Sequence, residues 1–143
     1  MAVLRQVTFR LSRRRSSVPR ARAALHAVLG GWCIDQGTLD TAELVLSELV
    51  TNALRARAPR DRQVGVRIAH SAEEGLLRLE VSDAGEGLPE VQSPSEGETG
   101  GRGLLLVEAL TYRWGVQGRE DGVGKTVWAD LKATEATASS GPV

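Results

Sequence analysis

Apolar and polar residues alternate in several separate stretches of the chain, and this period of two is typical of strands that bury one face. The alternating segments are 3–11, 63–70, 77–81, 112–117 and 125–131. The short glycine-containing connections 71–75 and 118–124 predict that two pairs of these segments form β-hairpins.

Three other segments carry apolar residues at helical spacing. The first runs from Ser17, the expected N-cap, to about Leu29 and stops at Gly30. The second opens at Thr38 or Asp40 and lasts to about residue 57, and the third covers 103–110. The second helix places one apolar arc on a single side, formed by Ala42, Val45, Leu46, Leu49 and Ala53.

The order of these elements predicts the fold class. Most strands follow one another through hairpins, whereas a Rossmann fold alternates strands and helices. We therefore expect an α+β two-layer sandwich, with a mixed, mostly antiparallel sheet and helices on one face. Residues 1–132 form a single domain in this interpretation, and the small, polar tail 133–143 is predicted to be disordered. The segment 84–100 is rich in Gly, Glu, Ser and Pro and is interpreted as a ligand lid.

The composition argues against several classes of protein but does not indicate an activity. The chain has 143 residues, with 41% hydrophobic and 25% charged residues and a net charge of zero. The net charge of zero gives no indication of nucleic-acid or membrane binding, and no apolar run approaches the roughly 20 residues of a membrane span. The single Cys33 excludes an internal disulfide, fits a cytoplasmic protein and is expected to be a small buried hydrophobe.

Charge is unevenly distributed despite the neutral total. The first 34 residues contain seven arginines and no acidic residue, including the run Arg13, Arg14 and Arg15. Such a run is commonly a solvated surface. Its alternative role is to steer an acidic protein partner towards the domain.

Glu48 and Asn52 lie one helical turn apart at the border of the apolar arc. A carboxylate there can act as a general base, and a carboxamide oxygen can ligate Mg²⁺. An exposed pair of polar residues on a helix is the ordinary alternative.

Asp83 ends a hydrophobic segment and precedes Gly85 and Gly87. A carboxylate at a strand end can accept a hydrogen bond from the exocyclic amine of adenine, and glycines allow the backbone to bend around a ligand. Asp at the start of a turn is also common without any ligand.

Two more segments complete the candidate site. Gly101, Arg102 and Gly103 precede or open the helix that contains Leu104, where backbone amides can receive phosphates. Thr126, at the start of the last strand, can hydrogen-bond near the base. Each segment alone also fits an ordinary loop or hairpin end, but their order and spacing together indicate an ATP–Mg²⁺ site.

The combined pattern resembles the Bergerat-type ATP-binding domain of histidine kinases, gyrase B and MutL-like proteins. Glu48 to Asn52 resembles its N-box, Asp83-x-Gly85-x-Gly87 its first glycine box, and Gly101-Arg102-Gly103-Leu104 its second. The resemblance is strongest to stand-alone bacterial anti-sigma-factor serine kinases of the actinobacterial type.

The resemblance implies ATP and Mg²⁺ as cofactors, Glu48 as catalytic base and Asn52 as metal ligand. It also implies a sigma factor and an anti-anti-sigma protein as partners, with a serine of the latter as substrate, and a possible homodimer. Two alternatives stay open: a module that holds nucleotide and sequesters a partner without turnover, and the ATPase fragment of a histidine kinase. Glu48 favours the kinase over the passive module.

Overall fold

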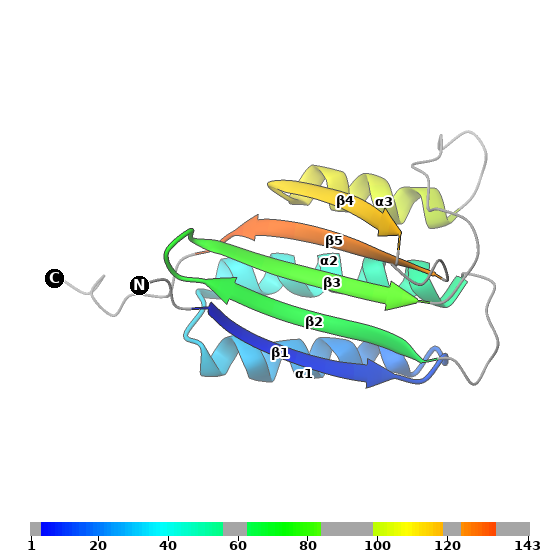
Figure 1. Cartoon of the computed structure of the whole chain (residues 1–143), viewed down its shortest axis with the longest axis horizontal. Coiled ribbons are helices and arrows are strands. Elements are labelled where there is room, and N and C mark those ends of the chain that lie inside the picture. The colour runs from blue at the N-terminus through cyan, green and yellow to red at the C-terminus, as the bar shows by residue number, and fades with distance from the viewer. Residues whose placement is uncertain (1–3, 56–62, 84–98, 119–123, 134–143) are drawn as a thin grey trace, which may run out of the picture.

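In the part of the chain that the structure describes, five strands form one sheet and three helices lie on one of its faces (Figure 1). The computed structural model describes residues 4–55, 63–83, 99–118 and 124–133, with backbone alone over 99–103. In chain order the elements are β1 Leu4–Leu11, α1 Ser17–Gly31, α2 Gln36–Arg55, β2 Val64–Ser71, β3 Leu76–Asp83, α3 Thr99–Leu110, β4 Arg113–Gly118 and β5 Lys125–Lys132.

The sheet order is β1-β2-β3-β5-β4, and all neighbours in this order are antiparallel. The predicted α+β two-layer sandwich is confirmed. The chain leaves β3 for α3, returns as the edge strand β4 and then inserts β5 beside β3. This insertion places the first residue of β5, Lys125, opposite the last residue of β3, Asp83.

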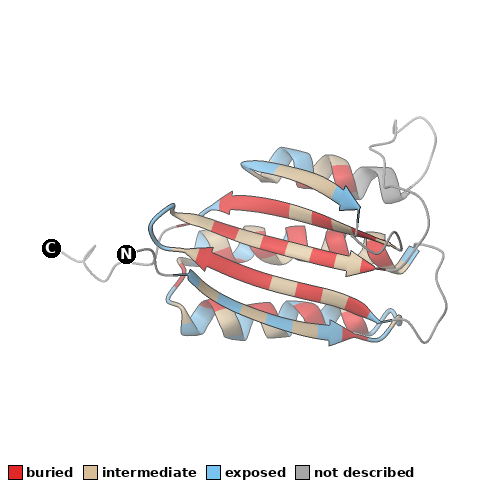
Figure 2. Ribbon diagram, in the orientation of Figure 1, coloured by how far each residue is buried: buried red, intermediate tan, exposed pale blue. Residues whose placement is uncertain are grey.

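The core lies between the sheet and α2, which packs against β2, β3 and β5 as well as against the other two helices. Inward residues of the strands alternate with outward ones, and the alternation of buried and partly exposed positions is visible along β3 and β5 in Figure 2. All five residues of the predicted arc on α2 are buried. Leu46 is fully buried, so truncation to Ala would cost about 2–5 kcal/mol of stability.

The helix starts differ from the sequence interpretation. Asp35, rather than Thr38 or Asp40, caps α2: its carboxylate accepts hydrogen bonds from the Thr38 amide at 3.0 Å and the Thr38 hydroxyl at 2.6 Å. These bonds, led by the one from the hydroxyl, outweigh burial and lower the pKa of Asp35. Ser17 is not the cap of α1 either, because it is the first helical residue and its hydroxyl donates to the Ser12 carbonyl.

The expectation that Cys33 is buried is wrong. Cys33 is exposed, with a positive φ of 58° in the turn that follows α1. Its amide donates to the Gly30 carbonyl, and this tight reversal turns the side chain outward while the next residue, Ile34, returns to the core.

The end of the described chain is tied to the sheet. Ala133, the first residue of the predicted tail, is buried, and its amide donates to the Gly75 carbonyl. Its own carbonyl lies 3.1 Å from Nε2 of the buried His70. Residues 134–143 lie outside the described part of the chain. No described helix is both long enough and apolar enough to cross a membrane.

Candidate functional site

Four elements that carry predicted site residues end or begin at the same end of the domain. In Figure 1 the last turn of α2, the end of β3, the start of α3 and the start of β5 all lie towards the right. The antiparallel pairing of β3 with β5 and the packing of α3 on α2 produce this convergence. Parts of α2, β3, α3 and β5, which are distant in sequence, are thereby brought to one end of the domain.

Glu48 and Asn52 are both partly buried on α2, next to the fully buried Leu49 and the buried Ala53. They occupy the border of the apolar arc, as the helical spacing predicts. A partly buried position suits residues that contact a ligand, since the backbone is fixed by core packing while the polar group keeps access to solvent.

The last turn of α2 is held by a residue distant in sequence. The Arg13 guanidinium donates to the carbonyl of Ala53 at 3.1 Å and to that of Leu54 at 3.4 Å. Helix C-termini leave such carbonyls without intrahelical donors, and a cation there also complements the helix dipole. Arg13 therefore stabilises the helix end that carries Asn52.

Asp83 is almost fully buried at the end of β3, and it forms an ion pair with Lys125. The Lys125 ammonium lies 3.3 Å from Oδ1 of Asp83, and the two residues are 3% and 1% exposed. Gly124, which precedes Lys125, has a positive φ of 84°, a conformation that glycine adopts without strain. The Asp83–Lys125 pair is thus the most deeply buried charge pair at this end of the described structure.

Sequence reasoning missed Lys125, although a signal was present. Lys125 belongs to the same inward-facing series of β5 as Val127, Ala129 and Leu131. A lysine that continues a buried apolar series requires a countercharge, and the register supplies Asp83.

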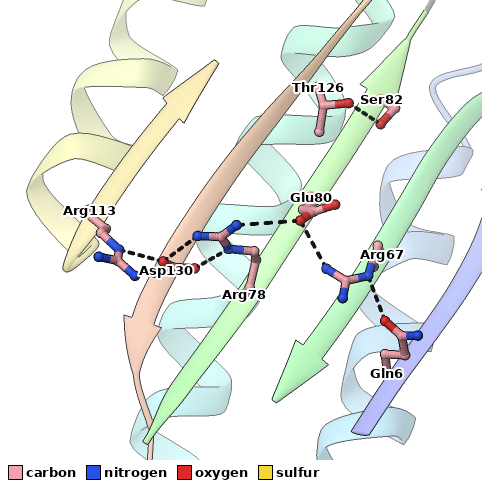
Figure 3. A network of polar contacts seen from close by, with 8 residues as sticks. All are labelled: Gln6, Arg67, Arg78, Glu80, Ser82, Arg113, Thr126 and Asp130. Atoms are coloured by element: carbon pink, nitrogen blue, oxygen red, sulfur yellow. Dashed lines mark hydrogen bonds and ion pairs between the residues drawn. The ribbon is translucent and has the colours of Figure 1, made fainter. Parts of the chain in front are cut away.

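The structure does not bring Thr126 to Asp83. Thr126 lies on the opposite face of β5, where its hydroxyl is 2.7 Å from that of Ser82 on β3 (Figure 3). Neighbouring residues of a strand point to opposite faces, so Thr126 and Lys125 cannot both face the helices.

The glycines of the second glycine segment lie inside α3 rather than before it. The helix starts at Thr99, four residues ahead of the predicted start, so Gly101, Arg102 and Gly103 belong to its first turns. Because glycine weakens a helix, the helix propensity of these residues does not predict the observed start at Thr99. Leu104 is buried at 2% exposure. Gly85, Gly87 and the predicted lid up to residue 98 lie outside the described residues.

The open face of the sheet, which is the face opposite the described helices, carries a second network of charged side chains (Figure 3). Asp130 on β5 accepts two hydrogen bonds from Arg78 on β3, at 2.7 and 2.9 Å, and one from Arg113 on β4 at 2.7 Å. Burial raises the pKa of Asp130, but the bonds from the two arginines outweigh burial and hold that pKa below its ordinary value of 3.8. The network continues through Glu80 to Arg67 and Gln6.

Arg78 also stacks over the Trp128 ring, with its guanidinium carbon 4.4 Å from the ring centroid. The Trp128 ring in turn covers Gly115 on β4, where an added Cβ would lie 2.7 Å from a ring atom. Arg78 and Trp128 therefore cover the part of this face between β3 and β4.

A hollow of about 900 Å³ lies at the other end of the domain, near the start of α2 and the β2–β3 turn. Its lining includes Asp35, Gly75, Tyr112 and Lys132. None of the predicted site residues lines it, so the volume of this hollow does not decide where a nucleotide would bind.

The chemistry of the described site residues fits a magnesium nucleotide. Asn52 offers a neutral oxygen, Glu48 a carboxylate, and the first turn of α3 backbone amides. Among the described residues, no group of three His, Cys, Asp or Glu side chains gathers to hold a metal on its own. Mg²⁺ commonly takes only one or two protein ligands and completes its shell with phosphates and water, so this donor set is compatible with it.

A model of the histidine kinase-like ATPase domain family matches residues 11–131. The fold is similar to that of the RsbU and RsbW domains of Rv1364c from Mycobacterium tuberculosis, with a TM-score of 0.66 and 19% identity over 93% of this chain and 35% of that one. No protein of curated function matches the sequence significantly.

Two structures of the blue-light activated histidine kinase of Erythrobacter litoralis EL346 are each 28% identical over 82% of this chain. The histidine kinase domain gives a TM-score of 0.50 with 59% of that chain covered, and the second structure gives 0.53 with 41% covered. This chain therefore spans less than two thirds of each of these solved chains.

Proposed function

Because the chain belongs to the family of histidine kinase-like ATPase domains, we propose that it binds ATP with Mg²⁺ and transfers the γ-phosphoryl group to a serine of an anti-anti-sigma protein. In the same proposal it holds a sigma factor until that partner displaces it. The observation that carries the proposal is the convergence of α2, β3, α3 and β5 at one end of the domain.

Three parts of the candidate site have separate roles in binding the nucleotide. Asp83 accepts a hydrogen bond from the adenine amine. Asn52 contributes its amide oxygen to Mg²⁺, which neutralises phosphate charge when bound. The start of α3, which contains Gly101, supplies backbone amides to the phosphates.

Glu48 is proposed as the general base. It accepts the proton of the serine hydroxyl while the serine oxygen bonds to the γ-phosphorus and the bond to ADP breaks. Its position one turn before Asn52 on a rigid, core-packed helix supports this role, because a base must be held near the attacking hydroxyl.

The test is transfer from radiolabelled ATP to a candidate anti-anti-sigma protein, combined with capture of sigma factors by the same preparation. The proposal expects ATP-dependent labelling of one serine and release of the sigma factor when unphosphorylated partner is added. If the protein binds ATP and captures a sigma factor but labels no cognate partner, it is a module that sequesters the sigma factor and not a kinase. Absence of ATP binding would contradict both forms of the proposal.

A further inference from the structure

Asp83 and Lys125 form a close ion pair, so a ligand at this position would meet both side chains. They are directly opposite in the β3–β5 register, so the hydrogen-bonded ladder fixes where both side chains start. The ammonium lies 3.3 Å from Oδ1, and the two side chains are only 1% and 4% exposed. Any group that approaches the carboxylate at hydrogen-bonding distance therefore also lies close to the ammonium.

Stability alone is a poor explanation for this arrangement. Removing a lysine and a carboxylate from water is costly, and the attraction within the pair does little more than offset that cost. Two apolar residues would hold the strand ends equally well. A buried ion pair at this position does, however, place a hydrogen-bond donor and an acceptor side by side.

Resting on the proposed nucleotide site, we infer that Lys125 determines base specificity by supplying a donor beside the acceptor Asp83. A carboxylate alone accepts from the 6-amino group of adenine and repels the 6-oxygen of hypoxanthine. With the ammonium 3.3 Å from the carboxylate, a base whose 6-position faces Asp83 turns N1 towards Lys125, so the N1 lone pair of adenine meets a donor, whereas the N1–H of hypoxanthine meets a second donor.

The consequence is a large difference between the affinities for 6-amino and 6-oxo purines. Adenine offers a donor at position 6 and an acceptor at N1, and hypoxanthine offers the reverse pair. In one orientation of the base, the fixed acceptor–donor pair of the protein complements adenine at both positions and hypoxanthine at neither, whereas a lone carboxylate distinguishes the two bases at position 6 only. Lys125 therefore narrows the set of nucleotides that the site accepts.

The experiment measures dissociation constants for ATP and ITP by calorimetry, for the wild-type protein and for Lys125→Met. The wild type is expected to bind ITP roughly a hundredfold or more weakly than ATP. The Lys125→Met variant is expected to reduce this ratio about tenfold, because ATP loses the hydrogen bond to N1 and the N1–H of ITP no longer faces a second donor. Lys125→Arg, which keeps a cationic donor, is expected to retain the large ratio.

Lys132→Met is the matched control, because Lys132 is an exposed lysine at the far end of the same strand, with its ammonium over the Tyr112 ring. If Lys125→Met fails to fold, Lys125→Thr removes the ammonium with a polar replacement and gives the same ratio test. An unchanged ATP-to-ITP ratio in a folded variant would overturn the inference about Lys125 alone. A wild-type protein that binds neither nucleotide would overturn the proposed function, and with it the premise of this inference.

Discussion

Strands β3 and β5 carry two cross-strand ion pairs on opposite faces of the same sheet. On the open face, Asp130 accepts hydrogen bonds on both carboxylate oxygens from Arg78 and a further one from Arg113. On the helix face, the Asp83 carboxylate receives the Lys125 ammonium at 3.3 Å. Both aspartates are 1% exposed, yet their partners differ in geometry and in position along the strands.

The difference separates a structural ion pair from one suited to a ligand. Arg78 and Arg113 together donate three hydrogen bonds to the Asp130 carboxylate, so both of its oxygens are already occupied by protein donors. The Asp130 network also joins three neighbouring strands, β3, β5 and β4. Lysine is a point charge on a flexible stem, and the Asp83–Lys125 pair sits where strands end and two helices converge. We therefore propose a structural role for the first pair and a role in ligand recognition for the second.

The largest expected effect comes from Glu48→Gln at the convergent end. The substitution keeps shape and hydrogen bonding but removes basicity, so phosphoryl transfer should fall by roughly 10²–10⁴ while ATP affinity stays within a few-fold. Glu43→Gln on the same helix, where Glu43 lies 3.6 Å from His26, is the control. Transfer that continues at the wild-type rate in Glu48→Gln would remove this residue as the base.

Asn52→Ala tests the metal role at the same end. Loss of one Mg²⁺ ligand should weaken ATP binding roughly tenfold when Mg²⁺ is present, and far less in EDTA. Calorimetry under both conditions makes the comparison. An equal loss in both would assign Asn52 to packing of the α2 terminus instead.

Asp130→Asn tests the structural pair. We expect a loss of about 1–2 kcal/mol in the free energy of unfolding at neutral pH, reduced from a fully buried pair because both arginines are partly exposed. Because the folded-state pKa of Asp130 lies below its ordinary value, its contribution is present above that value and is lost as pH falls through the folded pKa. Urea unfolding should show the gap between wild type and variant closing below about pH 4, and a gap that persists there would contradict the assignment.

The smallest expected effect concerns the basic loop before α1. Arg13 caps α2, so a fair test of electrostatic steering reverses only Arg14 and Arg15 to Glu. Association with an acidic partner should slow several-fold at low ionic strength, and the difference should fade at high salt. If the variant associates at the wild-type rate at low salt, Arg14 and Arg15 have no steering role and only form a solvated surface.

Alternation and helical spacing predicted the elements well, because burial on one face decides both patterns. The strand limits deviate by at most a few residues, and the apolar arc of α2 is buried throughout. Contacts between distant residues were not predictable from these patterns. The capping of α2 by Arg13 depends on how α1 and β1 pack, and no local signal in the sequence reports it.

The sequence pattern supplies the residue types of the candidate site but not the direction of each side chain. Thr126 was chosen for its hydroxyl, yet the strand directs that hydroxyl to the open face and directs Lys125 to Asp83. Counting the period from Val127 and Ala129 would have placed Lys125 on the inward face. The start of α3 was missed because glycines there contradict helix propensity, and tertiary packing against α2 overrides that preference.

Calorimetric titration of ATP into Asp83→Asn and Asp130→Asn, beside the wild type, tests the contrast between the two pairs most directly. Both variants replace a buried aspartate by its amide on neighbouring strands. We predict ATP binding at least roughly tenfold weaker for Asp83→Asn, about 1.4 kcal/mol, and unchanged for Asp130→Asn. Equal ATP affinity in Asp83→Asn and wild type, or an equal loss in both variants, would contradict the assignment of recognition to the Asp83–Lys125 pair.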